Sequence, residues 1–119
     1  MSRQIIISYK QNNVETQIDI GEWYMLGHQT ASYEFWSLPI LKEIGIKRLV
    51  VLGYSDPVYF EGWEDLEELD KEISLLEDNI EIIHFEEDTK KRWLRNLRNS
   101  LNRLIVLSPK LSNPLFEIG

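Results

Sequence analysis

The first twenty residues alternate between apolar and polar side chains. Ile5, Ile7 and Tyr9 alternate with polar neighbours as far as the Asn12-Asn13 pair, and the same alternation resumes beyond it. A period of two places successive side chains on opposite faces of a strand, and two such segments joined by turn-forming residues are typical of a β-hairpin. The pattern therefore predicts an antiparallel hairpin over Arg3–Ile20.

Two later segments carry apolar residues at every third or fourth position. One begins at Trp63 and ends at Asp78-Asn79, and the other follows a cap at Asp88 or Thr89. This spacing gathers apolar side chains on one face of a helix, so we predict two amphipathic helices. We expect their apolar faces to be buried in one shared core, which would contain Leu66, Leu69, Ile73, Leu76, Leu94, Leu97 and Leu101.

A further helix is expected before residue 45. Thr30 or Ser32 can cap a helix that ends at Gly45, a residue that readily adopts the left-handed conformation found after helices. Pro39 is unfavourable in the interior of that helix, because it has no backbone N–H and its ring collides with the preceding turn. The alternative is a helix that begins near Ser37 with the proline in its first turn.

Five segments have patterns that fit more than one structure or are short. Glu22–Gln29 fits a strand extension that runs into a loop, and Ile46–Gly53 fits a buried strand or a short helix. Ile80–Phe85 alternates enough for a short strand, and Leu104–Leu107 either continues the preceding helix or begins a strand. Leu115–Ile118 would add a terminal strand beside the hairpin.

These elements predict an α+β fold. The Arg3–Ile20 hairpin, with Leu115–Ile118 as a possible further strand, would form a small antiparallel sheet with about three helices packed on one face. The alternative is an α/β fold with a parallel βαβαβ sheet. Its strands would be Leu49–Leu52, Ile80–Phe85 and Leu104–Leu107, joined by the two long helices.

Composition is that of a globular protein with an acidic surface. Residues 1–119 fit one domain, with 43% hydrophobic and 28% charged residues. The net charge of −7 disfavours nucleic acid or an anionic membrane as the partner, since both repel it. The absence of cysteine excludes disulfides and thiolate metal sites. No secretory signal begins the sequence and no apolar run could span a bilayer, so we expect a cytoplasmic protein.

The charged residues change sign abruptly along the chain. Thirteen of the twenty acidic residues lie in Glu61–Asp88, opposed only by Lys71, whereas Thr89–Arg103 holds six cations and no acid. A surface of one sign helps a small protein to find an oppositely charged partner. We expect the basic helix to pair mainly with acids of the same chain, with each exposed pair contributing up to about 1 kcal/mol.

The acidic helix is the favoured partner-binding site. Glu64, Glu68 and Glu72 are four residues apart and share one helix face, where like charges destabilise the helix by about 0.2–0.5 kcal/mol per pair. A basic partner would offset this cost. The alternative is a solvated face that only keeps the protein soluble. Aromatic residues often anchor protein interfaces, and three precede or begin the acidic helix. The predicted partner-binding residues are therefore Tyr59, Phe60, Trp63, Glu64, Glu68 and Glu72.

No motif in the chain points to catalysis, a metal or a cofactor. The two histidines are isolated, and the acidic segment lacks the alternating ligands and central glycine of a calcium loop. The sequence has neither a nucleophile elbow nor a glycine-rich phosphate loop. We therefore expect a protein that is not an enzyme and that uses no metal or cofactor.

The middle of the chain, about residues 33–104, resembles small bacterial immunity proteins of polymorphic-toxin and contact-dependent growth inhibition systems. The similarity lies in the spacing of Phe35-Trp36, Leu41, Ile44-Gly45, Leu49, Leu52, Asp56-Pro57, Tyr59-Phe60-Glu61-Gly62, Leu66, Leu69, Glu72, Arg92, Asn96-Leu97 and Leu101. The resemblance implies a cytoplasmic protein that neutralises a cognate toxin by binding it. It also implies that Leu115–Gly119 is a final strand and that the basic helix continues past Leu104.

Charge and resemblance together favour one function. We expect an immunity-type protein whose acidic surface blocks a basic, nuclease-like toxin, because carboxylates can cover a cationic active site. The alternative is a structural or regulatory interaction module without inhibitory activity.

Overall fold

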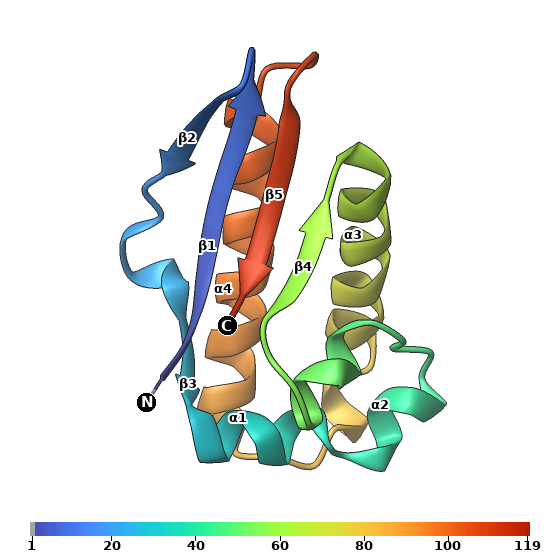
Figure 1. Cartoon of the computed structure of the whole chain (residues 1–119). Helices are drawn as coiled ribbons and strands as arrows, with labels where there is room; N and C mark the ends of the chain where they lie inside the picture. The colour runs from blue at the N-terminus through green and yellow to red at the C-terminus, as the bar shows by residue number, and fades with distance from the viewer. Residues whose placement is uncertain (1) are drawn as a thin grey trace.

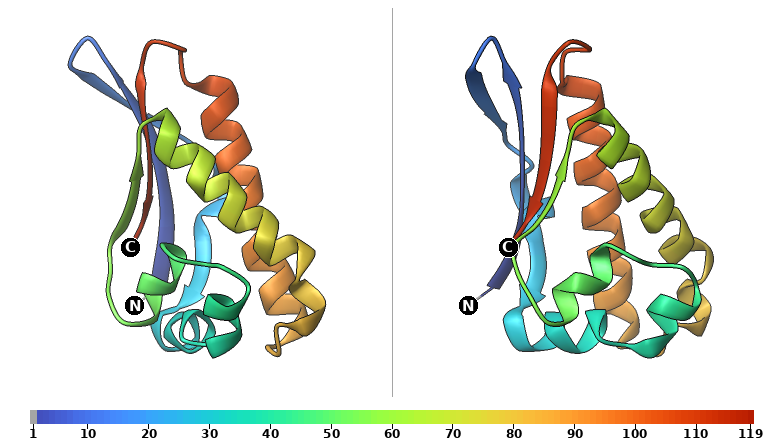
Figure 2. Two further views of the ribbon diagram at one scale, coloured as in Figure 1. Left: turned by 90° about the vertical axis from the view of Figure 1, so that its right-hand side faces the viewer. Right: turned by 45° about the vertical axis from the view of Figure 1, so that its right-hand side comes forward.

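A computed structural model describes residues 2–119 as an antiparallel sheet with helices packed on one of its faces (Figure 1, Figure 2). The five strands lie in the order β2-β1-β5-β4, and β3 also pairs with β1. Their bounds are β1 Ser2–Gln11, β2 Val14–Ile18, β3 Met25–His28, β4 Val58–Glu61 and β5 Asn113–Ile118. The α+β class expected from the sequence is confirmed.

The expected hairpin is present in β1 and β2. Asn12 and Asn13 form its two-residue turn with φ angles of 54° and 63°, between the paired residues Gln11 and Val14. Positive φ at both positions matches the right-handed twist of the strands, and asparagine tolerates it. Strand β2 ends at Ile18, two residues before the expected end.

The edge formed by β2 is continued by β3 after an interruption. Gln4 exchanges backbone hydrogen bonds with Gly119 at 2.8 and 3.0 Å and is also paired with Met25. Strand β3 therefore lies on the edge of β1 opposite β5, the edge that β2 also uses. Between them the chain forms the short 3₁₀ helix η1 (Gly21–Tyr24). Of the strand extension expected over Glu22–Gln29, only Met25–His28 is a strand, and it leads into a helix that begins at Gln29 rather than into a loop.

The helix expected before Gly45 is two helices. They are α1 (Gln29–Trp36) and α2 (Pro39–Glu43), with Pro39 in the first turn of α2. The break follows from the missing N–H of proline. Helix α1 begins at Gln29, so a cap at Thr30 or Ser32 is wrong. Gly45 ends α2 with a φ of 106°, as expected.

The two long helices are α3 (Trp63–Asp78) and α4 (Glu87–Leu107). The carboxylate of Glu86 caps α4 by accepting hydrogen bonds from the backbone N–H groups of Asp88 and Thr89, so neither of these residues is the cap. Residues 104–107 continue α4, which agrees with the extension past Leu104 that the resemblance implied.

The parallel βαβαβ alternative is wrong, because none of its three strands forms. Leu49–Leu52 belongs to the 3₁₀ helix η2 (Leu49–Gly53), and Ile80–Phe85 holds η3 (Ile80–Ile82) followed by a loop. The ammonium of Lys90 donates to the carbonyls of Ile80 and Ile83, each at 2.8 Å. This buried lysine satisfies backbone groups that a strand would have paired within a sheet.

Strand β4 was not expected from the sequence. It has only four residues, and its alternation places Val58 and Phe60 in the core and Tyr59 and Glu61 outward. Its partner β5 pairs with it from Val58↔Ile118 to Glu61↔Leu115. A strand this short gives a weak local pattern, and its stability comes from a segment more than fifty residues away.

The shared core of the two long helices is confirmed. Helix α3 packs on α4, and together they cover the inner face of the sheet (Figure 2). All seven apolar residues expected there are at most 3% exposed: Leu66, Leu69, Ile73, Leu76, Leu94, Leu97 and Leu101.

Truncation at the centre of this core should be costly. Leu69 and Leu97 are both 0% exposed, so we expect Leu69→Ala and Leu97→Ala each to lower the free energy of unfolding by about 2–5 kcal/mol. Urea denaturation would measure this loss. Val106→Ala is the control, because Val106 is 79% exposed and should lose only a few tenths of a kcal/mol. Core variants as stable as this control would contradict the packing.

Candidate protein-binding surface

The face of the sheet turned away from α3 and α4 is uncovered. Figure 2 shows the helices on the other side, and no helix of residues 2–119 packs on this outer face. Because Ile5, Ile7 and Phe116 point into the core, the residues between them along the strands point outward. The outer face carries Ile6, Ser8, Lys10, Glu15, Gln17, Tyr59, Glu61, Asn113, Leu115 and Glu117.

An aromatic side chain lies among carboxylates on this face. Tyr59 is paired directly with Glu117, which is paired on its other side with Ile6. In the next outward row Glu61 is paired with Leu115. Tyr59 is 49% exposed and Ile6 is 37% exposed, so apolar surface remains accessible.

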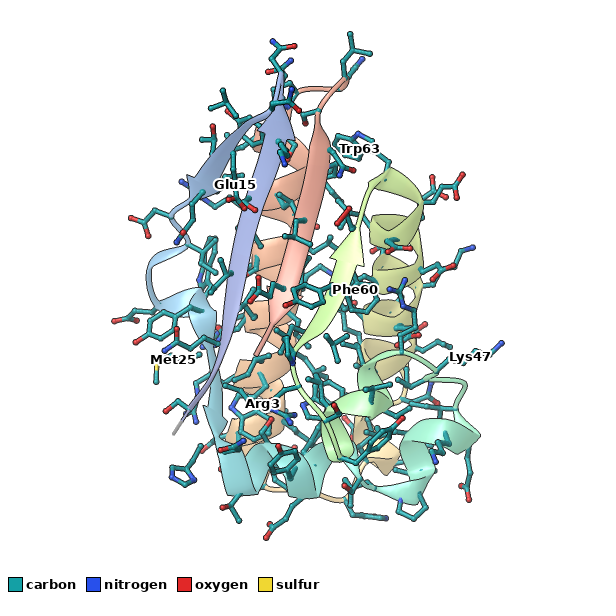
Figure 3. The ribbon with its side chains drawn as sticks, in the orientation of Figure 1. Arg3, Glu15, Met25, Lys47, Phe60 and Trp63 are labelled. Atoms are coloured by element: carbon teal, nitrogen blue, oxygen red, sulfur yellow. The ribbon has the colours of Figure 1, made fainter. Side chains whose placement is uncertain are left out.

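The outer face carries more carboxylates than cations. Glu15 lies on the edge strand β2 (Figure 3), Glu117 on the interior strand β5 and Glu61 on the edge strand β4. Among the outward-pointing residues of β1, β2, β4 and β5, Lys10, which is paired with Glu15, is the only cation. Tyrosine beside apolar and acidic groups is suited to binding a basic protein surface.

The structure separates the three predicted aromatic anchors. Tyr59 points outward, whereas Phe60 is 0% exposed and belongs to the core. Trp63 is half-buried where β4 leads into α3 (Figure 3), and its indole N–H donates to the carbonyl of Ser112 at 3.1 Å. This bond joins the start of α3 to the loop before β5. Of the three, only Tyr59 is exposed on the outer face.

Arg48 closes the free edge of β4. Its guanidinium lies 4.3 Å from the centre of the Phe60 ring and donates to the carbonyl of Tyr59 at 2.8 Å. The same group is 3.0 Å from Asp65 and 2.9 Å from Glu68. Unpaired strand edges attract other chains, and this cluster occupies the edge with side chains. The predicted Glu68 is therefore engaged within the molecule, although it remains exposed.

The pKa of Asp65 is lowered from its usual value by the hydrogen bond from Arg48 and then by the N–H of Glu61, 2.9 Å from the carboxylate. Both donors favour the ionised form. Asp65 thereby binds the cation at the strand edge and one backbone group of that edge.

Glu72 has a structural role. It is 7% exposed and accepts backbone hydrogen bonds from Lys47 at 3.2 Å, Arg48 at 2.9 Å and Leu49 at 3.0 Å. Its carboxylate thus satisfies the N–H groups at the start of η2, more than twenty residues earlier in the chain. A carboxylate that is buried and bound to three backbone N–H groups is not accessible to a partner. Glu72 and Phe60 are therefore not part of the exposed surface.

Other carboxylates of α3 pair with α4, as expected. Arg98 donates to Glu77 at 2.8 Å and also binds Asp70, which raises the pKa of Arg98 through both hydrogen bonds, that of Glu77 first. Glu64 and Glu67 are exposed and form no ion pair in the described part of the chain. Of the predicted residues, Tyr59 and Glu64 remain exposed and outside these ion pairs; Tyr59 lies on the outer face of β4, and Glu64 lies in the first turn of α3, three residues after Glu61.

Glu61, Glu117 and Glu15 were missed as surface residues. The alternation in Leu115–Ile118 and in the hairpin indicated which residues point outward. Which strands adjoin could not be read from that alternation, because β4 was not expected.

Within residues 2–119, no three His, Asp or Glu side chains converge in a way that could hold a metal ion. None of the helices in this part of the chain has the length and apolar character needed to cross a membrane. No family model matches the chain, and no curated protein or solved structure is significantly similar to it.

Removing the Glu72 carboxylate should destabilise the fold. Glu72→Ala leaves three backbone N–H groups near η2 without their acceptor, and we expect a loss of about 1–3 kcal/mol. Urea unfolding of this variant beside Glu64→Ala tests the role, because Glu64 is exposed and has no ion pair. Equal stability of the two variants would contradict it.

Acidification should reveal the Asp65 contact. Since the pKa of Asp65 is lower in the folded state, its contribution to stability is present above the ordinary carboxyl pKa. That contribution is lost as the pH falls through the folded-state value. Asp65→Asn should therefore be less stable than wild type at neutral pH and lose less stability on acidification. Urea unfolding over a pH series measures both, with Glu64→Gln as the control, and parallel pH profiles would contradict the effect.

Proposed function

We propose that this chain is a toxin-neutralising protein of immunity type, which blocks a basic protein through the acidic outer face of its sheet. The observation that carries the proposal is the half-exposed Tyr59, which lies beside Glu117 and Glu61 on a face that no helix of residues 2–119 covers. Such a protein would act in the cytoplasm and would not be an enzyme.

Charge supports a basic partner. The net charge is −7, and the carboxylates on and next to the outer face outnumber its one lysine. Electrostatic attraction accelerates the encounter between oppositely charged proteins, while buried aromatic anchors mainly slow dissociation. In this proposal Glu61, Glu64 and Glu117 attract the partner and Tyr59 anchors it.

The proposed surface differs in part from the one expected from the sequence. Phe60 and Glu72 are replaced by Glu61 and Glu117, because the first pair is buried and the second pair points outward. Glu68 stays at the margin of the surface. Its bond to Arg48 would have to be shared with, or exchanged for, a cation of the partner.

The test uses the protein encoded by the gene directly upstream, where a toxin gene would lie. The double variant Glu61→Lys/Glu64→Lys should slow association on the order of tenfold, because it reverses charge on the binding surface. Tyr59→Ala should mainly speed dissociation. Surface plasmon resonance at two salt concentrations would resolve both rates.

The control is Glu34→Lys/Glu43→Lys, which makes the same change in net charge on α1 and α2, where both residues are exposed. If both double variants slow association equally, net charge rather than the outer face is responsible and the site is wrong. If the upstream protein is not toxic, or if co-expression of this chain does not relieve its toxicity, the proposal that this chain neutralises a toxin is wrong. A complex without relief would favour the alternative, an interaction module without inhibitory activity.

A further inference from the structure

The outer side of α4 carries charge opposite to that of the sheet. Of the six cations in Thr89–Arg103, three are bound by acids of the same chain: Lys90 and Lys91 by Glu87, at 2.9 and 3.5 Å, and Arg98 by Glu77 and Asp70. Arg92, Arg95 and Arg103 are exposed and form no ion pair among the described residues. A basic surface therefore remains after the internal pairs are formed.

These arginines lie on one row of the helix. Residues 92, 95, 99, 103 and 106 are three or four positions apart, which places them on the same side of an α-helix. The row ends in apolar side chains, because Val106 is 79% exposed and the adjacent Leu107 is 46% exposed. With Ile105, which is 41% exposed, they form a contiguous apolar patch bordered by polar residues, a feature typical of interaction surfaces.

The side chain of Trp23 lies beside this row, because hydrogen bonds from α4 fix the position of the segment between β2 and β3 that contains Trp23. The Asn96 side chain donates to the carbonyl of Met25 at 2.8 Å, and the Ser100 hydroxyl donates to that of Trp23 at 3.4 Å. Arg103 Nε donates to the carbonyl of Asp19 at 2.9 Å. These bonds fix the interruption between β2 and β3 on the surface of α4.

The result is a hollow of about 300 Å³ at the C-terminal end of α4. It is lined by Trp23, Asn99, Asn102, Arg103, Val106 and Leu107. It has the size for one or two apolar side chains, with asparagine and arginine groups at its border.

We propose that this face binds an acidic segment of another protein, which places an apolar side chain in the hollow beside Trp23. The three arginines of this row form no ion pair within residues 2–119. The hydroxyl of Thr89 is the main cause of the lowered pKa of Glu86, to which the charge of Arg92 adds. Arginines without ion pairs favour carboxylates, and the apolar hollow supplies the anchor that such a segment needs. This surface lies on the helix side of the molecule, opposite the sheet face of the proposed function (Figure 2). The chain thus has two surfaces of opposite charge that can be occupied at the same time.

Other occupants fit this face less well. Two copies that pack α4 against α4 would bring their arginine rows together, so like charges would repel at the contact itself. A nucleic acid would meet the arginines, but its phosphates gain nothing from the apolar hollow, which an apolar side chain fills.

The probe is a short helical peptide with leucine at every third or fourth position and glutamate at most of the others. In two-dimensional NMR of the labelled protein, we expect the indole N–H signal of Trp23 to shift on addition of the peptide. Trp23→Phe assigns the signal. Arg92→Glu/Arg95→Glu should weaken binding by at least about tenfold and more at low salt, and Val106→Asp should abolish it.

The matched control is Lys42→Glu/Lys47→Glu, which makes the same change in net charge at exposed lysines away from α4. It should bind the peptide nearly as tightly as wild type. Tyr59→Ala should also keep binding the peptide, so failure here is distinguishable from failure of the proposed function. A peptide of the same composition with leucines spread around the helix should bind at least about tenfold more weakly.

Four results would overturn the proposal. An unshifted Trp23 signal would show that the hollow does not take the peptide, and equal affinity of the arginine variant and its control would remove the charge argument. A duplex DNA that binds more tightly than the peptide and is lost in Arg92→Glu/Arg95→Glu would assign the face to nucleic acid. A dimer in sedimentation equilibrium that Val106→Asp dissociates would assign it to a second copy.

Discussion

Burial of two apolar helix faces against one side of the sheet is the constraint on which the rest of the structure depends. Leu69 on α3 and Leu97 on α4 are both 0% exposed, as are Ile7 and Phe116 on the inner face of the sheet. Since both long helices lie on this side, the other face of the sheet stays open, and the outer side of α4 faces solvent. The two candidate surfaces are thus consequences of one-sided packing.

The charged residues fall into two groups: some stabilise the fold through several internal hydrogen bonds, and others are exposed and can contact a partner. Glu72 satisfies three backbone N–H groups, Lys90 binds two carbonyls, and Arg48 occupies the edge of β4. Buried or half-buried groups with several partners of this kind are costly to replace, because each substitution leaves polar atoms unsatisfied. Charged residues without such contacts remain at the surface, where they can attract a partner. Glu64 and Arg95 are examples.

The two surfaces differ in sign and in how they are built. The outer sheet face presents Tyr59 beside carboxylates on two paired strands. The α4 face depends on Trp23, which the helix holds through main-chain hydrogen bonds to the segment between β2 and β3. The interruption of the edge strand is therefore part of the second surface, since a continuous strand would not place the indole over α4.

Local periodicity by itself determined the hairpin, the two long helices, their shared core and the terminal strand, because each depends on which side of a short segment is apolar. It also indicated that acidic and basic helices would pair, as Arg98 does with Glu77. Tertiary structure alone decided that Val58–Glu61 is a strand, since its partner is β5, and that Ile80–Phe85 is not one, since Lys90 binds its carbonyls. It also decided that Glu72 and Phe60 are buried while Glu117 and Tyr59 adjoin on the open face. These outcomes depend on contacts between residues far apart in the chain, and the pattern of a single segment carries no information about which distant group will meet it.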